Sequence, residues 1–189
     1  MQREIIESTK AFGKMLEEYV PKTGYSIPSS LRILNLGCGR CFEGHVLSDY
    51  FACIHLVGID ANPKKIAKAK EEYTEMMSVP KSKYEFIVGD ARKLTKIVNG
   101  KFEVLVARHP NVAEIPDVWK EIFSEAKRLM KPESLLIATS FGSKEHEVLE
   151  KQLKNLSYEI IFSCTNEYSP STTGPYMIDK KVLFARKKD

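Results

Sequence analysis

A short apolar run that ends in two glycines constrains this chain more than any other stretch. Residues Arg32–Cys41 read RILNLGCGRC, and a helical stretch from about Phe42 to Phe51 follows. Glycines at such a turn let the backbone approach a ligand closely, because a Cβ would collide or force an unfavourable φ. The stretch therefore predicts a buried strand, a glycine loop and a helix beside a nucleotide-like ligand.

Strands and helices alternate along the rest of the chain. We expect strands at 31–36, 54–59, 84–88, 102–107 and 135–140, with two final strands at 158–164 and 182–186. Helices are expected from Asn62, as N-cap, and Pro63, over about 117–131, and after Ser143 as a cap. This alternation predicts a parallel sheet with helices on both faces. No helix separates the last two strands, so that pair can be antiparallel.

Length and composition point to one domain. The chain has 189 residues, of which 43% are hydrophobic and 29% charged, enough for one buried core. We assign residues 1–30 to an amphipathic helix (2–20) and linker, either packed on the domain or acting as a flap over the ligand, and 31–189 to the domain itself. No apolar run reaches the length of a membrane span, and four scattered cysteines favour a reducing compartment. We expect a soluble, unprocessed cytoplasmic protein without a membrane partner.

Small or polar residues follow four of the expected strands. In an open parallel sheet, ligands bind outside the carboxyl ends of the strands. Asp60 follows the glycine loop by about twenty residues, where a carboxylate can accept both hydroxyls of a ribose. Phe42 occupies the third glycine position of a dinucleotide fingerprint, which disfavours NAD. The residues at the four strand ends are Gly37 and Gly39, Asp60, Asp90 and Ala91, and Arg108 and His109.

Four segments together resemble the class I S-adenosylmethionine-dependent methyltransferases: ILNLGCG (33–39), VGID (57–60), VGDA (88–91) and FEVLVA (102–107). The resemblance implies a Rossmann-like three-layer α/β/α sandwich with a mostly parallel seven-stranded sheet and an antiparallel last strand. Two residues depart from the pattern: Asn35 replaces a common acid and Cys41 the usual third glycine. The resemblance implies S-adenosyl-L-methionine as cofactor, in contact with Leu36, Gly37, Cys38, Gly39, Asp60, Ala61, Asp90, Ala91 and Ala107.

The end of the fourth strand suggests how the methyl acceptor is held. Methyl transfer from a sulfonium needs alignment and exclusion of water more than a fixed catalytic triad. We expect Arg108 to orient an acidic group of the acceptor, and His109 to bind that group or take its proton. The alternative is that Arg108 pairs with a surface carboxylate and His109 caps the loop.

We therefore expect a methyltransferase acting on a small acceptor that can be anionic, rather than on nucleic acid. Three alternatives remain: a tRNA or rRNA methyltransferase that grips RNA through the basic residues at 180–188, a non-catalytic S-adenosylmethionine-binding protein, and an NAD(P)-dependent oxidoreductase. The two cysteines of Cys38-x-x-Cys41 are expected to fill the loop, with no metal, because no second pair accompanies them. Trp119 is expected to pack near the pocket rim, and Tyr168 and Tyr176 to wall an acceptor pocket.

Overall fold

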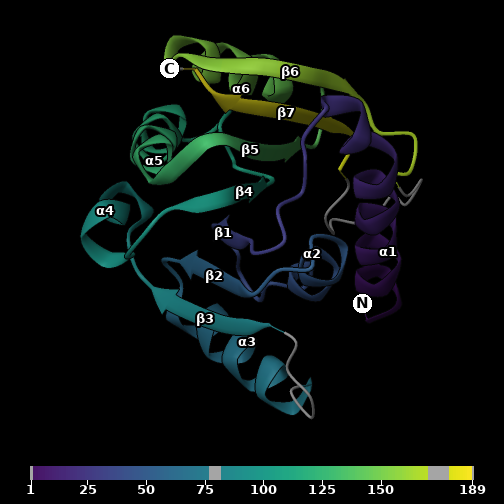
Figure 1. Cartoon of the computed structure of the whole chain (residues 1–189), viewed down its shortest axis with the longest axis vertical. Coiled ribbons are helices and arrows are strands. Elements are labelled where there is room, and N and C mark those ends of the chain that lie inside the picture. The colour runs from purple at the N-terminus through teal and green to yellow at the C-terminus, as the bar shows by residue number, and fades with distance from the viewer. Residues whose placement is uncertain (1, 77–81, 170–178, 189) are drawn as a thin grey trace.

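The computed structural model of the chain describes residues 2–76, 82–169 and 179–188. Within these residues, seven strands form one sheet in the order β3-β2-β1-β4-β5-β7-β6. Figure 1 shows this order from β3 near the bottom of the view to β6 at the top. The strands are β1 (Arg32–Leu36), β2 (His55–Asp60), β3 (Lys83–Val88), β4 (Phe102–Arg108), β5 (Met130–Ser140), β6 (Tyr158–Thr165) and β7 (Lys181–Lys187).

The strand directions confirm the predicted sheet. Neighbouring strands from β3 to β5 pair in parallel. Strand β7 is antiparallel to both β5 and β6 and lies between them, so the last strand of the chain is inserted into the sheet. The carboxyl ends of the parallel strands therefore meet at one edge, where the predicted site residues stand.

Helices cover both faces of the sheet, as the sequence predicted. Phe12 of α1, Leu47 of α2 and Ile66 of α3 belong to one buried cluster. Leu94 of α4, Phe123 of α5 and Leu149 of α6 belong to the cluster on the opposite face. The helices are α1 (Gln2–Tyr19), α2 (Gly44–Tyr50), α3 (Pro63–Met76), α4 (Leu94–Ile97), α5 (Pro116–Leu129) and α6 (Ser143–Asn155), with short 3-10 turns η1 (Pro21–Thr23) and η2 (Ala91–Lys93).

Local chemistry explains where the helices begin and end. The backbone N–H groups of Lys64 and Lys65 donate to Asn62 Oδ1 at 3.0 and 3.2 Å, which confirms Asn62 as the cap of α3. The predicted cap of α6 was wrong, because Ser143 is already helical and Gly142 holds the cap position without a side-chain bond. The predicted start of β5 was also late, since Met130 is extended and pairs with Phe102.

The N-terminal helix packs on the domain. Phe12, Met15 and Leu16 of α1 are fully buried, and α1 lies beside α2 (Figure 1). These contacts favour packing over a free flap. Within the described residues, no helix combines the length and the apolar character that crossing a bilayer requires.

Candidate functional site

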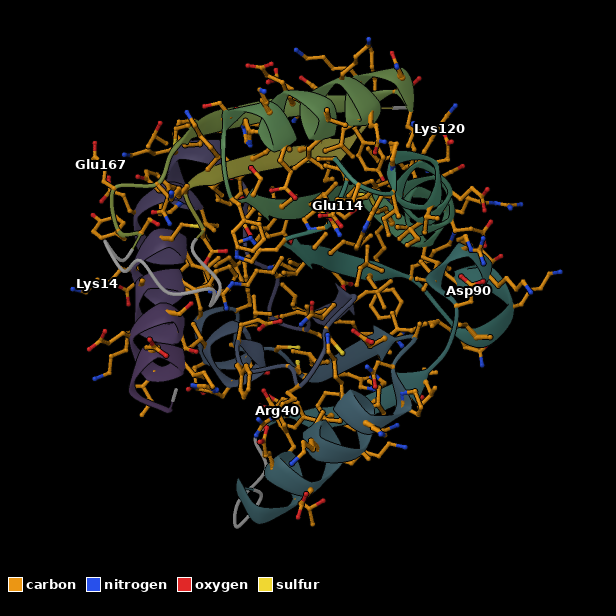
Figure 2. The ribbon with its side chains drawn as sticks, turned by 180° about the vertical axis from the view of Figure 1, so that it is seen from behind. Lys14, Arg40, Asp90, Glu114, Lys120 and Glu167 are labelled. Atoms are coloured by element: carbon orange, nitrogen blue, oxygen red, sulfur yellow. The ribbon has the colours of Figure 1, made fainter. Side chains whose placement is uncertain are left out.

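A cavity of about 450 Å³ lies beside the carboxyl ends of β1, β2 and β3. Figure 2 shows Asp90, one of its lining residues, below the helix α5 that carries Lys120. The volume of the cavity falls in the range of small-ligand pockets. Five predicted site residues meet in its lining, namely Gly37, Asp60, Ala61, Asp90 and Ala91.

The opposite wall of the cavity comes from the first turns of α5. Trp119 was expected to pack near the rim and does line the cavity, together with Ile115, Val118 and Ile122. The other three are wall residues that the sequence did not single out. Their spacing is that of one helical face, which the sequence indicates equally well for a core and for a cavity wall.

The glycine loop brings backbone against the cavity wall. Gly37 has a φ of 63°, and a Cβ there would lie 3.3 Å from the Trp119 ring. The N–H of Cys38 donates to the carbonyl of Ile59 at 3.0 Å, which ties the loop to β2. Cys41 adopts a φ of 56°, a left-handed conformation that glycine adopts most readily. The loop thus keeps a glycine-type path despite this departure.

Asp60 is held in place by backbone groups. Its Oδ2 accepts the N–H of Gly39 at 2.9 Å, and its Oδ1 accepts the N–H of Asn62 at 2.7 Å. A carboxylate oxygen has a second lone pair, so each oxygen can still accept a ligand hydroxyl. The side chain therefore fits the diol of a ribose.

Asp90 caps the turn η2 at the cavity edge. Its Oδ1 accepts the backbone N–H of Arg92 at 3.0 Å, and its Oδ2 accepts Arg92 Nη2 at 2.8 Å. The hydrogen bonds and charge of Arg92 lower the pKa of the Asp90 carboxyl. An ionised acceptor beside the backbone of Ala91 suits an exocyclic amine of a base.

The remaining predicted cofactor residues are not among those that line the cavity. Leu36 and Ala107 are fully buried at the ends of β1 and β4, and Gly39 contacts Asp60. A hydrogen bond with Cys41, and then burial, raises the pKa of the Cys38 thiol, which disfavours a metal-binding thiolate. The described residues contain no cluster of three or more potential metal ligands.

Arg108 lies in a buried ion pair at the end of β4. Its Nε donates to both carboxylate oxygens of Asp179 at 3.0 Å, and its Nη2 to Oδ2 at 2.5 Å and to Ser8 Oγ at 2.7 Å. Its Nη1 lies 3.7 Å from Glu43 Oε2, and the side chain is 3% exposed. From the sequence, we expected Arg108 to contact either an acidic group of the acceptor or a surface carboxylate. Its partners in the structure are instead two buried carboxylates.

Opposite charges keep this cluster ionised. Burial alone would raise the pKa of Asp179, but Arg108 and His109 outweigh it and hold that pKa well below its usual range. Burial alone would lower the pKa of Arg108, but Asp179 and Glu43 outweigh it and raise that pKa. Neither Glu43 nor Asp179 was singled out from the sequence.

His109 stands immediately after this pair with a left-handed backbone. Its φ is 53°, and its ring stacks on Phe141 with centroids 4.0 Å apart and planes 22° from parallel. Its Nε2 lies 3.0 Å from Asp179 Oδ1. The imidazole is therefore confined between an aromatic ring and a carboxylate. Of the two tyrosines expected to wall an acceptor pocket, Tyr176 lies outside the described residues, and the ring of Tyr168 lies against Tyr19 of α1 with centroids 6.2 Å apart.

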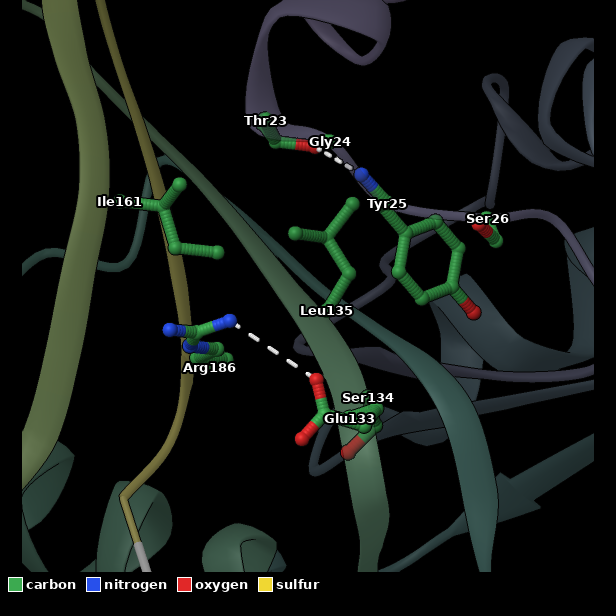
Figure 3. A pocket seen from close by; sticks show the side chains of 9 residues that line it. All are labelled: Thr23, Gly24, Tyr25, Ser26, Glu133, Ser134, Leu135, Ile161 and Arg186. Carbon is green, nitrogen blue, oxygen red and sulfur yellow. Dashed lines mark hydrogen bonds and ion pairs between the residues drawn. The ribbon is translucent and has the colours of Figure 1, made fainter.

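A smaller hollow of about 190 Å³ lies at the amino ends of the strands, away from these residues (Figure 3). Its polar groups contact one another: Arg186 Nη1 lies 3.7 Å from Glu133 Oε2, and Thr23 Oγ1 accepts the N–H of Tyr25 at 3.1 Å. These paired groups give no sign of a ligand site.

The strand order, the glycine loop and the carboxylate at the end of β2 define a class I methyltransferase fold with a nucleoside-sized cavity. A family described as a methyltransferase domain matches residues 27–177, and the chain belongs to this family. The resemblance to the class I S-adenosylmethionine-dependent methyltransferases is thus confirmed. This assignment removes the oxidoreductase alternative.

Solved structures share the fold at low identity. An S-adenosylmethionine-dependent methyltransferase from Clostridium acetobutylicum aligns with a TM-score of 0.70 at 12% identity, covering 95% of this chain and 92% of that one. Magnesium protoporphyrin IX methyltransferase from Synechocystis, with bound S-adenosylmethionine, gives 0.68 at 16%, covering 94% and 80%. Ribosomal protein L11 methylase from Lactobacillus delbrueckii gives 0.64 at 12%, covering 90% and 76%. No curated protein matches significantly. Since the two named acceptors differ, the fold leaves the acceptor open.

Proposed function

We propose that this methyltransferase binds the adenosine of S-adenosylmethionine in the cavity beside Trp119 and methylates a small molecule. The observation that carries the proposal is the convergence of Gly37, Asp60 and Trp119 on one cavity. Asp60 would hold the ribose hydroxyls, and Asp90 with Ala91 would meet the adenine edge. The apolar wall from α5 would cover the base and exclude water.

The chain's own residues have a limited task in the reaction. Bound S-adenosylmethionine supplies an electrophilic methyl group on a sulfonium. The loop at Gly37 and Gly39 and the end of β4 at Ala107 would orient that group, and His109 would face the acceptor. Most of the rate gain would then come from alignment in a dry site.

The charge around Arg108 bears on the kind of acceptor. We expected an anionic acceptor because a free guanidinium would attract one. In the structure, Asp179 and Glu43 face that guanidinium, so it carries no unpaired charge toward a ligand. We therefore propose that Arg108 acts on the site through Asp179, and that the acceptor needs no anionic group.

The position of the basic residues favours a small acceptor over RNA. Strand β7 runs antiparallel to β5, with Lys181 opposite Ser140 and Arg186 opposite Leu135. The basic run is thereby divided between the two edges of the sheet, and Arg186 is paired with Glu159 at 2.7 Å. A continuous basic surface that binds RNA beside the cavity would need these charges close together.

Binding followed by turnover tests the proposal. In calorimetry on the full chain, S-adenosylmethionine and S-adenosylhomocysteine should bind with one site, and NAD⁺ should show no heat under the same conditions. A screen of small acceptors should then release S-adenosylhomocysteine. Methylation confined to RNA would overturn the small-acceptor part, and binding of NAD⁺ in preference to the sulfonium would overturn the whole.

A further inference from the structure

The carboxylate of Asp179 is fixed on several sides. It accepts both Nε and Nη2 of Arg108, while its backbone carbonyl accepts Asn166 Nδ2 at 2.8 Å. Asp179 is 1% exposed and lies two positions before β7. Because these hydrogen bonds fix the carboxylate of Asp179, it can orient a side chain that it contacts.

The two ring nitrogens of His109 have different surroundings. Nε2 lies 3.0 Å from Asp179 Oδ1, within hydrogen-bond distance. Both nitrogens are buried and neither makes an aligned hydrogen bond with the described residues, but it is Nε2 that lies at ion-pair distance from the Asp179 carboxylate. The side chain is 7% exposed, and the ring over it belongs to Phe141, which is itself 46% exposed. A buried nitrogen without a partner is costly, so it indicates a place where a ligand supplies one.

The carboxylate decides which nitrogen carries the proton. An imidazole next to a carboxylate is most stable when the nearer nitrogen bears hydrogen and donates it. With that hydrogen on Nε2, the lone pair is on Nδ1. Arg108 supports this state because it balances the charge of Asp179 and leaves that carboxylate as an acceptor only.

We propose that Asp179 is a positioning residue that holds His109 as the Nε2–H tautomer, so that Nδ1 receives the proton of a methyl acceptor. The inference rests on the proposed methyltransferase function and restricts the acceptor to a hydroxyl, amine or thiol that carries a proton. The acceptor atom forms a bond to the methyl carbon while the carbon–sulfur bond breaks. The electron pair of that bond stays on sulfur, and the acceptor proton passes to Nδ1.

Nitrogen NMR of the full chain with ¹⁵N-labelled histidine tests this assignment. The sequence has four histidines, so His109→Gln assigns the signal by its loss. With S-adenosylhomocysteine present, the neutral ring should show hydrogen on Nε2 and an unprotonated Nδ1. Phenol, which has a proton to donate, should shift the Nδ1 signal, and anisole, which lacks it, should not. A hydrogen on Nδ1, or equal responses to the two compounds, would overturn the proposal.

Asp179→Asn tests the positioning role, with His146 as the control inside the same molecule. His146 is held between Ser140 Oγ at 3.0 Å and Ser163 Oγ at 2.8 Å, so its signals should stay unchanged in a folded variant. The His109 tautomer should become mixed and the response to phenol should fall. An unchanged tautomer and response in Asp179→Asn would refute the role of Asp179. If this variant does not fold, the tautomer of His109 in the wild-type protein still tests whether Nε2 carries the hydrogen.

The two proposals fail in different ways. Wild-type protein that binds no S-adenosylhomocysteine but keeps the Nε2–H tautomer contradicts the proposed function alone. Wild-type protein that binds S-adenosylhomocysteine and carries the hydrogen on Nδ1 contradicts the present inference alone.

Discussion

Asn35 donates a 2.6 Å hydrogen bond to Glu43, eight positions further along the chain. The sequence placed an amide where the family commonly has an acid, and this bond brings a carboxylate to the same point from the next loop. Glu43 is 3% exposed and also faces Arg108. A carboxylate of the buried charge cluster at the end of β4 thus contacts the position of β1 where the resemblance leads one to expect an acid.

Removing that carboxylate should destabilise the fold strongly. Glu43→Ala leaves the amide of Asn35 with only Cys41 Sγ at 3.4 Å as a partner and removes the carboxylate that faces Arg108 Nη1, so we expect a loss of about 3–5 kcal/mol in unfolding free energy. Glu43→Gln keeps the bond from Asn35 and should lose less. Glu147→Ala, at an exposed position of α6, is the control and should change stability by less than about 0.5 kcal/mol in urea unfolding. Equal losses of unfolding free energy in Glu43→Ala and in this control would refute a stabilising role of the Glu43 carboxylate.

The pH dependence of stability should reveal Asp179. Its folded pKa lies below the unfolded value, so its stabilisation is present above about pH 4 and is lost as pH falls toward the folded pKa. At pH 7, Asp179→Asn should cost about 3–5 kcal/mol, because Arg108 stays buried without its partner. The gap between wild type and this variant should narrow below about pH 4 in urea unfolding. A gap that is constant from pH 7 to pH 3 would contradict the assignment.

Gly37 and Gly24 share a left-handed backbone, so substituting each of them distinguishes an effect on folding from an effect on binding. Gly37 and Gly24 have φ values of 63° and 69°, but a Cβ would contact Trp119 only at position 37 and meets nothing within 4 Å at position 24. Gly37→Ala and Gly24→Ala should each cost about 1–2 kcal/mol in thermal unfolding. Only Gly37→Ala should weaken S-adenosylhomocysteine binding in calorimetry. Equal affinities in the two variants would count against the glycine loop as a cofactor contact.

The single tryptophan should report the ligand. Trp119 is the one tryptophan of the sequence and lines the cavity, so an adenine bound beside it should change the intrinsic fluorescence. We expect a saturable change on titration with S-adenosylhomocysteine, and none with methionine alone. A titration that saturates in calorimetry without any change in fluorescence would place the base elsewhere.

Local signals in the sequence were enough for the sheet and the cofactor residues. The glycines at 37 and 39 and the carboxylate at 60 could be found because each follows a buried strand, and parallel strands end at one edge. The pairing of Met130 with Phe102 could not be predicted from the sequence, because the helical pattern continues past Leu129 and sheet contacts override it.

The charge cluster at the end of β4 was beyond the reach of the sequence for a different reason. Arg108 and Asp179 are 71 positions apart, and no local pattern marks a carboxylate that is buried only by distant packing. The wall of the cavity was hidden in another way. Val118 and Ile122 lie on a helical face that looks the same whether it meets the core or a ligand.

The most direct test of the account is the affinity for S-adenosylhomocysteine of wild type, Asp60→Asn and Asp49→Asn, measured by isothermal titration calorimetry. Asp60 lines the cavity, whereas Asp49 is exposed on α2 and serves as the control. Wild type and Asp49→Asn should bind with equal affinity, and Asp60→Asn roughly 10- to 100-fold more weakly, as expected for lost hydrogen bonds to a charged acceptor. Wild-type protein that does not bind, or an Asp60→Asn variant that binds as tightly as wild type, would contradict the account.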